Sequence, residues 1–414
     1  MGKTPSINIK NNKPLCLAYV IERFPAPTEY FILNEIISLE KRGVKIVVLS
    51  IKKNKSRIPL SNPYTPQAIV IYPFGLYQIL CSLRGIKQLL KIVFSNKGAF
   101  HFRSFFKQLR DAFFSVSFEK QLKNFKITHI HAHFAFIATD IGYILSKLLN
   151  INFSFTAHAQ DIFLNKQHII GKMECATFVL TCTKYNLNYL NILSENRFKK
   201  KLHLIYHGIY GENKSFHHHQ KPSPIVSKLQ ILTAARLVEK KGTIYLLKAI
   251  KLLVERGVNI SCIIIGNGPL KKELECFVNN TGINSYVTFL GSKNRSDVLQ
   301  IMENSDIFAL PSIIASNGDM DGLPNVLLEA MLMEIPVIST NISAIPELIE
   351  NNVTGILVPE KDEKAIADAI YKLIHNPKFY HSIICNAKNK IIQKFNINLS
   401  TDKLVQLFQR SCKN

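Results

Sequence analysis

The chain has 414 residues, of which 47% are hydrophobic and 20% are charged. That length and apolar content suit two or three folded domains and exclude a largely disordered chain. The net charge of +23 is concentrated in residues 1–200, which carry 28 Lys and Arg against 10 Asp and Glu. This basic half favours an anionic neighbour, and both nucleic acid and an anionic membrane surface meet that requirement.

The start of the chain and its cysteines indicate a cytoplasmic protein. Residues 1–14 are polar and basic, which argues against a cleaved signal peptide. The longest apolar stretch, residues 69–83, is interrupted by Pro73 and Gln78 and is shorter than the roughly 20 residues of a membrane-spanning helix. The 8 cysteines form no CxxC pair, as expected for reduced thiols.

The first half opens with alternating strand and helix patterns. Residues 15–21 form a short apolar run, residues 31–39 repeat apolar side chains at helical spacing, and residues 44–51 form a second strand after Gly43. This order predicts a βαβ unit in a parallel sheet, whose ligands gather at the carboxyl ends of the strands. Glu29 opens the predicted helix, where a carboxylate either serves the helix dipole alone or contacts a substrate.

Residues 73–126 combine positive charge with aromatic side chains. From Arg84 to Lys126 the chain carries ten Lys and Arg against two acidic residues, and phenylalanines recur between them. Such a segment either lies on the inner face of the cytoplasmic membrane or packs its aromatic rings in the core beneath a solvated basic face. Because no nucleic-acid-binding motif accompanies it, we expect no nucleic-acid partner.

Polar residues mark the ends of the next two strands. His129, His131 and His133 alternate along one strand and share a face. No carboxylate or cysteine lies at a spacing that would complete a metal site, so we expect no metal there. His133 ends this strand, and His158 and Asp161 follow the next one, which makes these residues candidates to line a cleft at the sheet edge.

A polar segment divides the chain. Residues 210–229 contain two prolines and three consecutive histidines, a composition typical of a solvated linker. We therefore expect an N-terminal acceptor-side domain over 1–209 and a second domain over 230–390. The last residues, 391–414, are expected to form a helix that packs back on the first domain.

The second half begins with another strand, at 229–234, which is followed by Arg236 and Lys241. A guanidinium and an ammonium at a sheet edge can grip a diphosphate together, although the same charges can also be ordinary surface groups. The strand at 260–265 ends in a turn, Gly266 to Pro269, where missing side chains would let a ligand approach the backbone.

Residues 316–340 contain a Gly-Pro loop, a helix start and a strand. The free N–H groups and the positive dipole end of the helix suit an anion such as phosphate. Asp321 and Glu329 stand on either side of this helix start. Because carboxylates repel phosphate, they are better suited to the hydroxyl groups of a sugar. The alternative is a helix cap at Asp321 and a solvated Glu329.

Three motifs, in this order, resemble the donor domain of the GT4 family of retaining glycosyltransferases. They are ARLVEKKG with Arg236 and Lys241, IIIGNGPL with Gly266 and Gly268, and DGLPNVLLEAM with Asp321 and Glu329 in an E-x7-E pattern. The resemblance implies an α/β protein of the GT-B fold, with two Rossmann-like, doubly wound domains facing a central cleft. It also implies transfer of a sugar with retention, without a metal or other cofactor, from a UDP- or GDP-linked donor to a saccharide or lipid-linked saccharide in bacterial surface polysaccharide biosynthesis.

The resemblance assigns the donor-side roles to residues of the second half. Glu329 would hold the ribose hydroxyls of the nucleotide, and Arg236 and Lys241 would hold the diphosphate. Asp321 would hold the transferred sugar together with the backbone of the residues that follow it, which are Gly322, Leu323, Pro324 and Asn325.

The first half is similar to the exopolysaccharide and colanic-acid branch of that family through FPAPTEYFILNE, HAHFA and TAHAQDI. This similarity places His158 near the donor sugar, with Asp161 close by among the catalytic candidates. It also places Glu29 and His133 on the acceptor side of the cleft.

Three positions depart from the family pattern. His207-Gly208 stands where Asn-Gly is more familiar, which leaves the identity of the donor open. Asp321 stands where Glu is usual, which shortens the reach to the sugar by one methylene. Glu334 stands where Gly commonly ends the helix, so we expect the turn there to close differently. Two other functions would use the same residues: a glycoside hydrolase with Asp321 and Glu329 as acid and base, or an inactive nucleotide-sugar-binding protein at the membrane.

Overall fold

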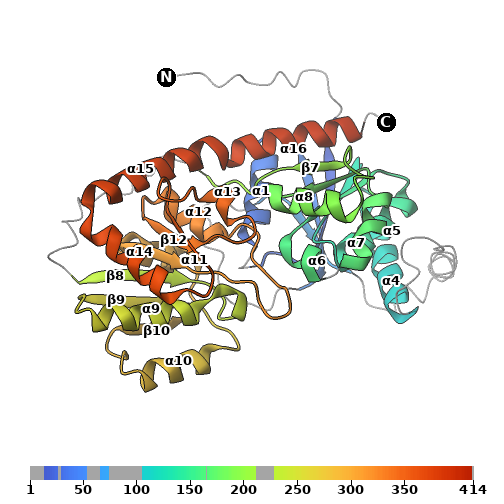
Figure 1. Ribbon diagram of the computed structural model, residues 1–414. Coiled ribbons are helices and arrows are strands. Elements are labelled where there is room, and N and C mark those ends of the chain that lie inside the picture. Colours follow the sequence, from blue (N-terminus) through green and yellow to red (C-terminus); the bar gives the residue numbers. More distant parts are fainter. Residues whose placement is uncertain are drawn as a thin grey trace.

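The computed structural model describes residues 14–26, 29–53, 66–73, 105–164, 166–210 and 228–412. The predicted linker lies almost entirely outside these described residues, and so do residues 74–104 of the basic aromatic segment. The described residues form two α/β domains, each built around its own parallel sheet (Figure 1). The predicted class, two doubly wound domains, is confirmed.

The N-terminal domain has a seven-stranded sheet in the order β3-β2-β1-β4-β5-β6-β7. Alternate residues of its central strand enter two different cores: Ala18 and Val20 pack on one face, and Leu17, Tyr19 and Ile21 pack on the other. The described elements are β1 (Cys16–Arg23), α1 (Tyr30–Glu40), β2 (Lys45–Lys52), β3 (Ile69–Ile71), α4 (Phe105–Leu122), β4 (His129–His133), α5 (Ile137–Leu149), β5 (Phe153–Ala157), α6 (Ala159–Leu164), α7 (Lys166–Cys175), β6 (Phe178–Thr181), α8 (Lys184–Leu193) and β7 (Leu202–Leu204).

The C-terminal domain has a six-stranded parallel sheet in the order β10-β9-β8-β11-β12-β13. The strand order reverses beside β8, so the ends of β8 and β11 flank the crevice where such sheets bind ligands. The elements are β8 (Leu229–Ala234), η1 (Glu239–Lys241), α9 (Thr243–Glu255), β9 (Ile260–Ile265), α10 (Lys271–Asn280), β10 (Val287–Gly291), α11 (Arg295–Glu303), β11 (Ile307–Leu310), α12 (Asn325–Leu332), β12 (Val337–Thr340), α13 (Ile345–Leu348), β13 (Ile356–Val358), α14 (Glu363–His375), α15 (Pro377–Lys394) and α16 (Ile397–Ser411).

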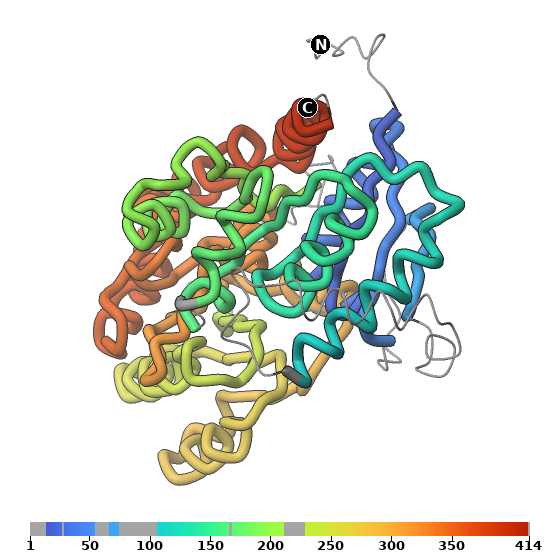
Figure 2. The backbone as a smooth tube through the Cα atoms, turned by 90° about the vertical axis from the view of Figure 1, so that its right-hand side faces the viewer, coloured from blue at the N-terminus to red at the C-terminus, as the bar shows by residue number. Residues whose placement is uncertain are grey.

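The end of the chain crosses back to the N-terminal domain. α15 packs against α12, and α16 packs against α1, as the red helices in Figures 1 and 2 show. Arg42 donates to the carboxylate of Asp402 at 2.6 Å and to the backbone carbonyl of Asn398 at 3.0 Å. Gly208 permits the crossing, because a Cβ at this position would lie 2.3 Å from the Cα of Ile397.

The helix α4 has features of both interpretations of the basic aromatic segment. Phe118, in its second half, is fully buried in the core. At its start Phe106 is 79% exposed and Leu109 is 38% exposed, beside the exposed Lys107 and Arg110. No helix among the described residues is both long and apolar enough to cross a membrane.

Candidate active site

The loop that precedes α12 is held by consecutive residues of η1. The carboxylate of Glu239 accepts hydrogen bonds from the backbone N–H of Ser316 at 3.0 Å and from its hydroxyl at 2.8 Å. The ammonium of Lys240, which is buried, donates to Asp319 at 3.0 Å. These bonds join the end of β8 to the loop after β11 and so fix where α12 begins.

Lys241 and Asp321 form a buried ion pair. The ammonium donates to both carboxylate oxygens of Asp321, at 2.9 and 2.8 Å, and the hydroxyl of Ser312 donates to Oδ2 at 2.7 Å. Burial opposes ionisation of Asp321, but Lys241 and Lys240, helped by Ser312, hold its pKa below the usual value. Asp321 is therefore a carboxylate at neutral pH, and it is neither a helix cap nor a proton donor.

Glu329 is paired with Arg295, which sequence analysis does not single out. The guanidinium Nε of Arg295 donates to Oε1 of Glu329 at 2.8 Å. Its guanidinium carbon also lies 5.6 Å from the ring centroid of Tyr30, in the N-terminal domain. The second carboxylate oxygen of Glu329 has no hydrogen-bond partner among the described residues and can accept from a ligand hydroxyl.

Arg236 lies between the strand end and η1 and is exposed. It makes no ion pair with a described residue, unlike Lys240 and Lys241. The first turn of α12 contains no acidic residue, and its N-cap, Pro324, makes no side-chain capping bond. An unpaired guanidinium and uncapped N–H groups on the same side of one sheet suit a diphosphate.

The glycines of the Gly-Asn-Gly-Pro turn serve packing, and the expectation that they also let a ligand approach the backbone stays a prediction. A Cβ on Gly266 would lie 1.8 Å from the carbonyl oxygen of Ala235, and a Cβ on Gly268 would lie 2.3 Å from that of Leu237. Gly266 also has φ +141°, which side chains rarely adopt. The two glycines thus bring the β9 turn against the segment that carries Arg236.

The turn after α12 closes in the way that a glycine would close it, so the expected difference at Glu334 is wrong. Glu334 adopts the left-handed conformation, with φ 59°. The N–H of Ile335 donates to the carbonyl of Ala330 at 3.0 Å, as in a Schellman motif. The side chain of Glu334 accepts a hydrogen bond from Lys388 on α15, which helps to hold this conformation.

On the opposite side of the cleft, His158 is buried and its Nε2 has no hydrogen-bond partner among the described residues. Burial, together with His207, His133 and His131, lowers its pKa well below the usual value, so the ring is neutral. The two domains meet here, since a Cβ on Gly322 would lie 3.2 Å from the Cβ of Ala159. The sugar-binding loop implied by the resemblance therefore lies beside the segment that carries His158.

Asp161 positions backbone instead of lining the cleft. It is completely buried, and its carboxylate accepts hydrogen bonds from the N–H of His158 at 2.7 Å and from the N–H of Ala135. Burial raises its pKa to about 7, although those two bonds oppose the shift. The structure thus gives Asp161 a positioning role, in which it joins the ends of β4 and β5, and not a direct catalytic one.

His133 lies beneath the cleft and does not face it. It is 1% exposed, with its ring centroid 5.9 Å from that of His158 and its Nε2 3.4 Å from Glu35. Glu35 also accepts a hydrogen bond from the hydroxyl of Tyr19 at 2.8 Å. Burial opposes ionisation of Glu35, but His133 and Tyr19 hold its pKa below the usual value.

Glu29 is half-buried at the start of α1. Burial raises its pKa, and the nearby His133 lowers it again in part.

The remaining two histidines of β4 contact hydroxyl groups. His129 contacts the hydroxyls of Ser154 at 2.7 Å and Ser411 at 3.1 Å. His131 contacts those of Ser154 at 2.7 Å and Thr156 at 2.9 Å. In each of these two rings, both nitrogens therefore already contact a hydroxyl group. Burial lowers the pKa of His129 to about 3 and that of His131 well below its usual value.

A carboxylate from the C-terminal domain joins the two domains. Glu347 of α13 accepts hydrogen bonds from the first two N–H groups of α8, those of Lys184 and Tyr185, both at 2.8 Å. It also accepts one from the hydroxyl of Tyr206 at 2.7 Å. Met320, from the loop before α12, packs against the core of the N-terminal domain. These contacts hold the two sets of strand ends face to face.

Sequence reasoning missed several residues of this site, and one rule would have found some of them. Cys182 follows β6 directly, Ser312 lies two residues after β11 and His207 lies three residues after β7. Each could have been flagged as a polar group at the end of a parallel strand. Glu35 and Arg295 lie inside helices, where no local signal distinguishes them from solvated residues.

Comparison with known families decides the nature of the second domain. The family model for glycosyl transferases group 1 matches residues 215–390. This match covers less than half of the chain. An amylovoran biosynthesis glycosyltransferase, AmsK of Erwinia amylovora, is 35% identical over 182 residues, which are 44% of this chain and 45% of that protein. The match thus spans less than half of this curated relative, and it confirms the resemblance drawn from the three motifs.

Solved structures extend the likeness of this glycosyltransferase domain to the fold of the whole chain. A glycosyltransferase from Rickettsia africae has a TM-score of 0.70 at 17% identity, covering 98% of this chain and all of that one. Anabaena Alr3699/HepE, solved with UDP and glucose, has a TM-score of 0.68 at 17% identity, covering 94% of this chain and 98% of that one. At such identities the likeness shows the fold alone, and the predicted GT-B arrangement is confirmed.

Proposed function

We propose that the protein is a retaining glycosyltransferase that moves a sugar from a UDP- or GDP-linked donor to a saccharide or lipid-linked saccharide acceptor in surface polysaccharide biosynthesis. The observation that carries this proposal is the position of three groups at the strand ends that face His158. They are the exposed Arg236, the paired Lys241 and the uncapped start of α12. A domain of the glycosyltransferase group 1 family supports it. So does the structural likeness to a protein that holds UDP and glucose.

The charge of the leaving group sets the mechanism. As the bond between sugar and nucleotide breaks, negative charge builds on the diphosphate and positive charge on the sugar ring. Arg236, Lys241 and the N–H groups at the start of α12 stabilise the diphosphate. Lys241 stays in contact with Asp321, which fixes the position of its ammonium relative to the phosphate.

The remaining groups hold the donor on either side of the diphosphate. The free oxygen of Glu329 accepts a hydrogen bond from a ribose hydroxyl. Asp321, with the backbone from Gly322 to Asn325, holds the sugar from one side. The neutral His158 holds it from the other side through its unpartnered Nε2. The leaving phosphate itself takes the proton of the acceptor hydroxyl on the same face of the ring, so the transfer needs no metal.

The hydrolase alternative requires a carboxylic acid with a raised pKa to protonate the leaving group. Asp321 has the opposite property, because Lys241 and Lys240 hold its pKa below the usual value. Glu329 is paired with the permanent positive charge of Arg295. Neither carboxylate is therefore suited to act as a general acid.

Incubation with radiolabelled UDP- and GDP-linked sugars tests the proposal. We expect sugar transfer to a saccharide acceptor, whereas release of sugar without a nucleotide would indicate a hydrolase, and binding alone would indicate an inactive module. Arg236→Ala should lower turnover by about tenfold or more, because it removes one donor to the charge that develops. This variant breaks no ion pair with a described residue, so its effect reports on the ligand.

Lys241→Ala should have an effect of similar size, but it also leaves the buried carboxylate of Asp321 without its partner. Its melting temperature must therefore be compared with that of the parent. Lys251→Ala, which removes only a surface pair with Glu255, provides the matched control and should keep full turnover. Near-normal transfer in both Arg236→Ala and Lys241→Ala would overturn the assignment.

We also propose that the start of α4 rests on the cytoplasmic membrane. The exposed Phe106 and Leu109 lie beside Lys107 and Arg110, a combination that suits an anionic interface. In liposome flotation the protein should bind anionic vesicles, and Phe106→Ser combined with Leu109→Ser should weaken binding. Leu399→Ser, at another exposed apolar residue, serves as the control. Equal absence of binding to anionic and neutral vesicles would contradict this proposal.

A further inference from the structure

Three potential metal ligands meet at the ends of neighbouring strands of the N-terminal sheet. His158 follows β5, Cys182 follows β6 and His207 lies beyond β7, and these strands are adjacent in the sheet. One ligand atom from each residue lies within 4.8 Å of the other two. The cluster contains two nitrogen donors and one sulfur donor, which zinc prefers among the divalent metals of proteins.

The polar atoms of this cluster lack partners. Both His158 Nε2 and His207 Nε2 are buried, and neither has a hydrogen-bond partner among the described residues. Buried polar atoms are nearly always paired, so two unpaired ring nitrogens in one small region indicate a missing ligand. The donor sugar of the proposed function would account for His158 alone.

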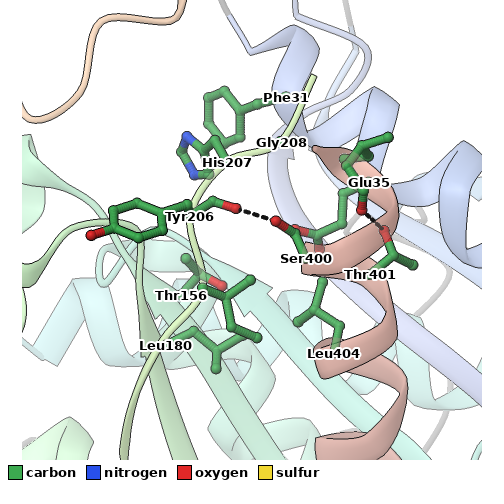
Figure 3. Close-up of a pocket in the computed structure, with 12 residues that line it drawn as sticks. Phe31, Glu35, Thr156, Leu180, Tyr206, His207, Gly208, Ser400, Thr401 and Leu404 are labelled. Carbon is green, nitrogen blue, oxygen red and sulfur yellow. Dashed lines mark hydrogen bonds between the residues drawn. The ribbon is translucent and has the colours of Figure 1, made fainter. Parts of the chain in front are cut away.

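The surroundings favour a cation. The carboxylates of Asp161 and Glu347 both lie close enough to the Cys182 thiol to interact with it electrostatically. The ring of Phe31 is stacked on that of His207, with centroids 4.1 Å apart (Figure 3). Phe134 lies 4.3 Å from His158 by the same measure. An apolar shell with negative charge behind the ligands strengthens binding of a divalent cation.

The second cluster of possible ligands fits a metal less well, although both ring nitrogens of His133 also have no hydrogen-bond partner among the described residues. Glu35, His131 and His133 also place their ligand atoms within 4.8 Å of one another. However, both nitrogens of His131 already contact hydroxyls, those of Ser154 and Thr156. A metal there would have to break two hydrogen bonds, whereas none is lost at His158 Nε2 and His207 would give up only its contact with the side chain of Asn325.

We propose that His158, Cys182 and His207 bind one Zn²⁺ ion, and that this ion inhibits the enzyme by withdrawing His158 Nε2 from the donor sugar. On binding, Cys182 loses its proton to solvent and coordinates as a thiolate, while both histidines coordinate as neutral rings. Metal–ligand distances of about 2.0–2.3 Å require separations of roughly 3.3–3.8 Å between ligand atoms. The ligand atoms already lie within 4.8 Å of one another, so they need to approach by no more than about 1.5 Å. The fourth position stays open to water. The inhibitory part rests on the proposed function, whereas metal binding does not.

Cobalt titration tests the metal site without any assay of activity. Co²⁺ replaces Zn²⁺ in such sites and gives a thiolate-to-metal absorption band only when a cysteine is a ligand. His217, His218 and His219 should first be replaced by alanine in every protein used, because this run in the sequence binds metal incidentally. The parent should show the band at one metal ion per chain.

Two buried cysteines provide matched variants. Cys182→Ala should abolish the thiolate band, and Cys262→Ala, at a fully buried cysteine of the other domain, should retain it. If Cys182→Ala fails to fold by circular dichroism, His207→Gln takes its place and should weaken Co²⁺ binding about tenfold or more. A parent without the band, or a band that persists in Cys182→Ala, would overturn the proposal.

Inhibition is measured separately on the transferase reaction. Zn²⁺ should lower the transfer rate of the parent about tenfold or more, with recovery on adding EDTA, because one contact to the reacting sugar is lost. Cys182→Ala should resist Zn²⁺, with inhibition measured against its own rate without metal. Zinc binding without inhibition would overturn the inhibitory role, but the proposed metal site would still stand. Absence of transfer with every donor would reject the proposed function, and the cobalt titration would still decide the site.

Discussion

The strand ends of the C-terminal domain carry charges in ion pairs, whereas those of the N-terminal domain carry histidines that burial keeps neutral. On the first side Lys241 and Asp321 stabilise each other as ions. On the second side His158 and His207 have lowered pKa values, that of His207 at about 4. The difference matches the proposed chemistry, because a diphosphate needs fixed positive charge and a sugar needs neutral hydrogen-bonding groups.

The two sides should also respond differently to acid, and this is the largest effect that we expect. His129, His131, His158 and His207 all have pKa values lowered by burial. Protonation therefore favours the unfolded chain, and their contribution to stability is lost as pH falls below the unfolded value of about 6.5. Asp161 acts in the opposite sense, since its raised pKa of about 7 means that its contribution is lost as pH rises through 7.

The lowered pKa values of these four histidines outweigh the raised pKa of Asp161, so the free energy of unfolding of the N-terminal domain should fall between pH 6 and pH 5. The pKa of Asp321 is lowered, so its contribution persists until the pH approaches that of an ordinary carboxyl group. Hydrogen exchange resolved by peptide should therefore show protection lost in β4 and β5 while β8 and β11 remain protected.

A matched variant isolates the contribution of one ring. His129→Gln keeps a hydrogen-bonding side chain beside Ser154 and Ser411 but cannot take a proton in this range. It should reduce the dependence of stability on pH by about 1 kcal/mol per pH unit below 6. Equal loss of protection in both domains, or an unchanged slope in this variant, would refute the comparison.

The fold follows from the sequence because each parallel strand is a local apolar run. The runs at 153–157, 229–234 and 260–265 are observed as β5, β8 and β9 with the same bounds. The general place of the site also follows, since both domains are doubly wound and bind ligands at strand ends. Arg236 and Asp321 could be selected for this reason together with the family motifs.

The partners within the site could not be predicted, because they are set by which strand ends become neighbours. Nothing local pairs Lys241 with Asp321, which is 80 positions away. Nor does the sequence show that the ring nitrogens of His129 and His131 are already bonded to hydroxyls across β5. The packing role of Gly266 is hidden for the same reason, since a glycine that admits a ligand and one that admits a neighbouring backbone look alike.

The packing role of Gly266 leads to a second prediction about stability, with a smaller expected effect than the loss of stability in acid. Gly266→Ala should destabilise the C-terminal domain by about 2–3 kcal/mol, because the new Cβ would clash with the carbonyl of Ala235 and the backbone conformation is unfavourable for alanine. Gly282→Ala is the control: it also has positive φ, at +71°, but no atom lies within 4 Å of the new Cβ. It should cost only about 1 kcal/mol.

Urea denaturation followed by circular dichroism measures both variants. If Gly266 is there to admit a ligand, the two alanines should cost the same and only turnover should fall in Gly266→Ala. If it joins the β9 turn to the segment with Arg236, the extra loss appears without any donor present. Stability of the N-terminal domain, followed through β4 and β5, should be unchanged in both variants. The loss of stability should thus be confined to the C-terminal domain.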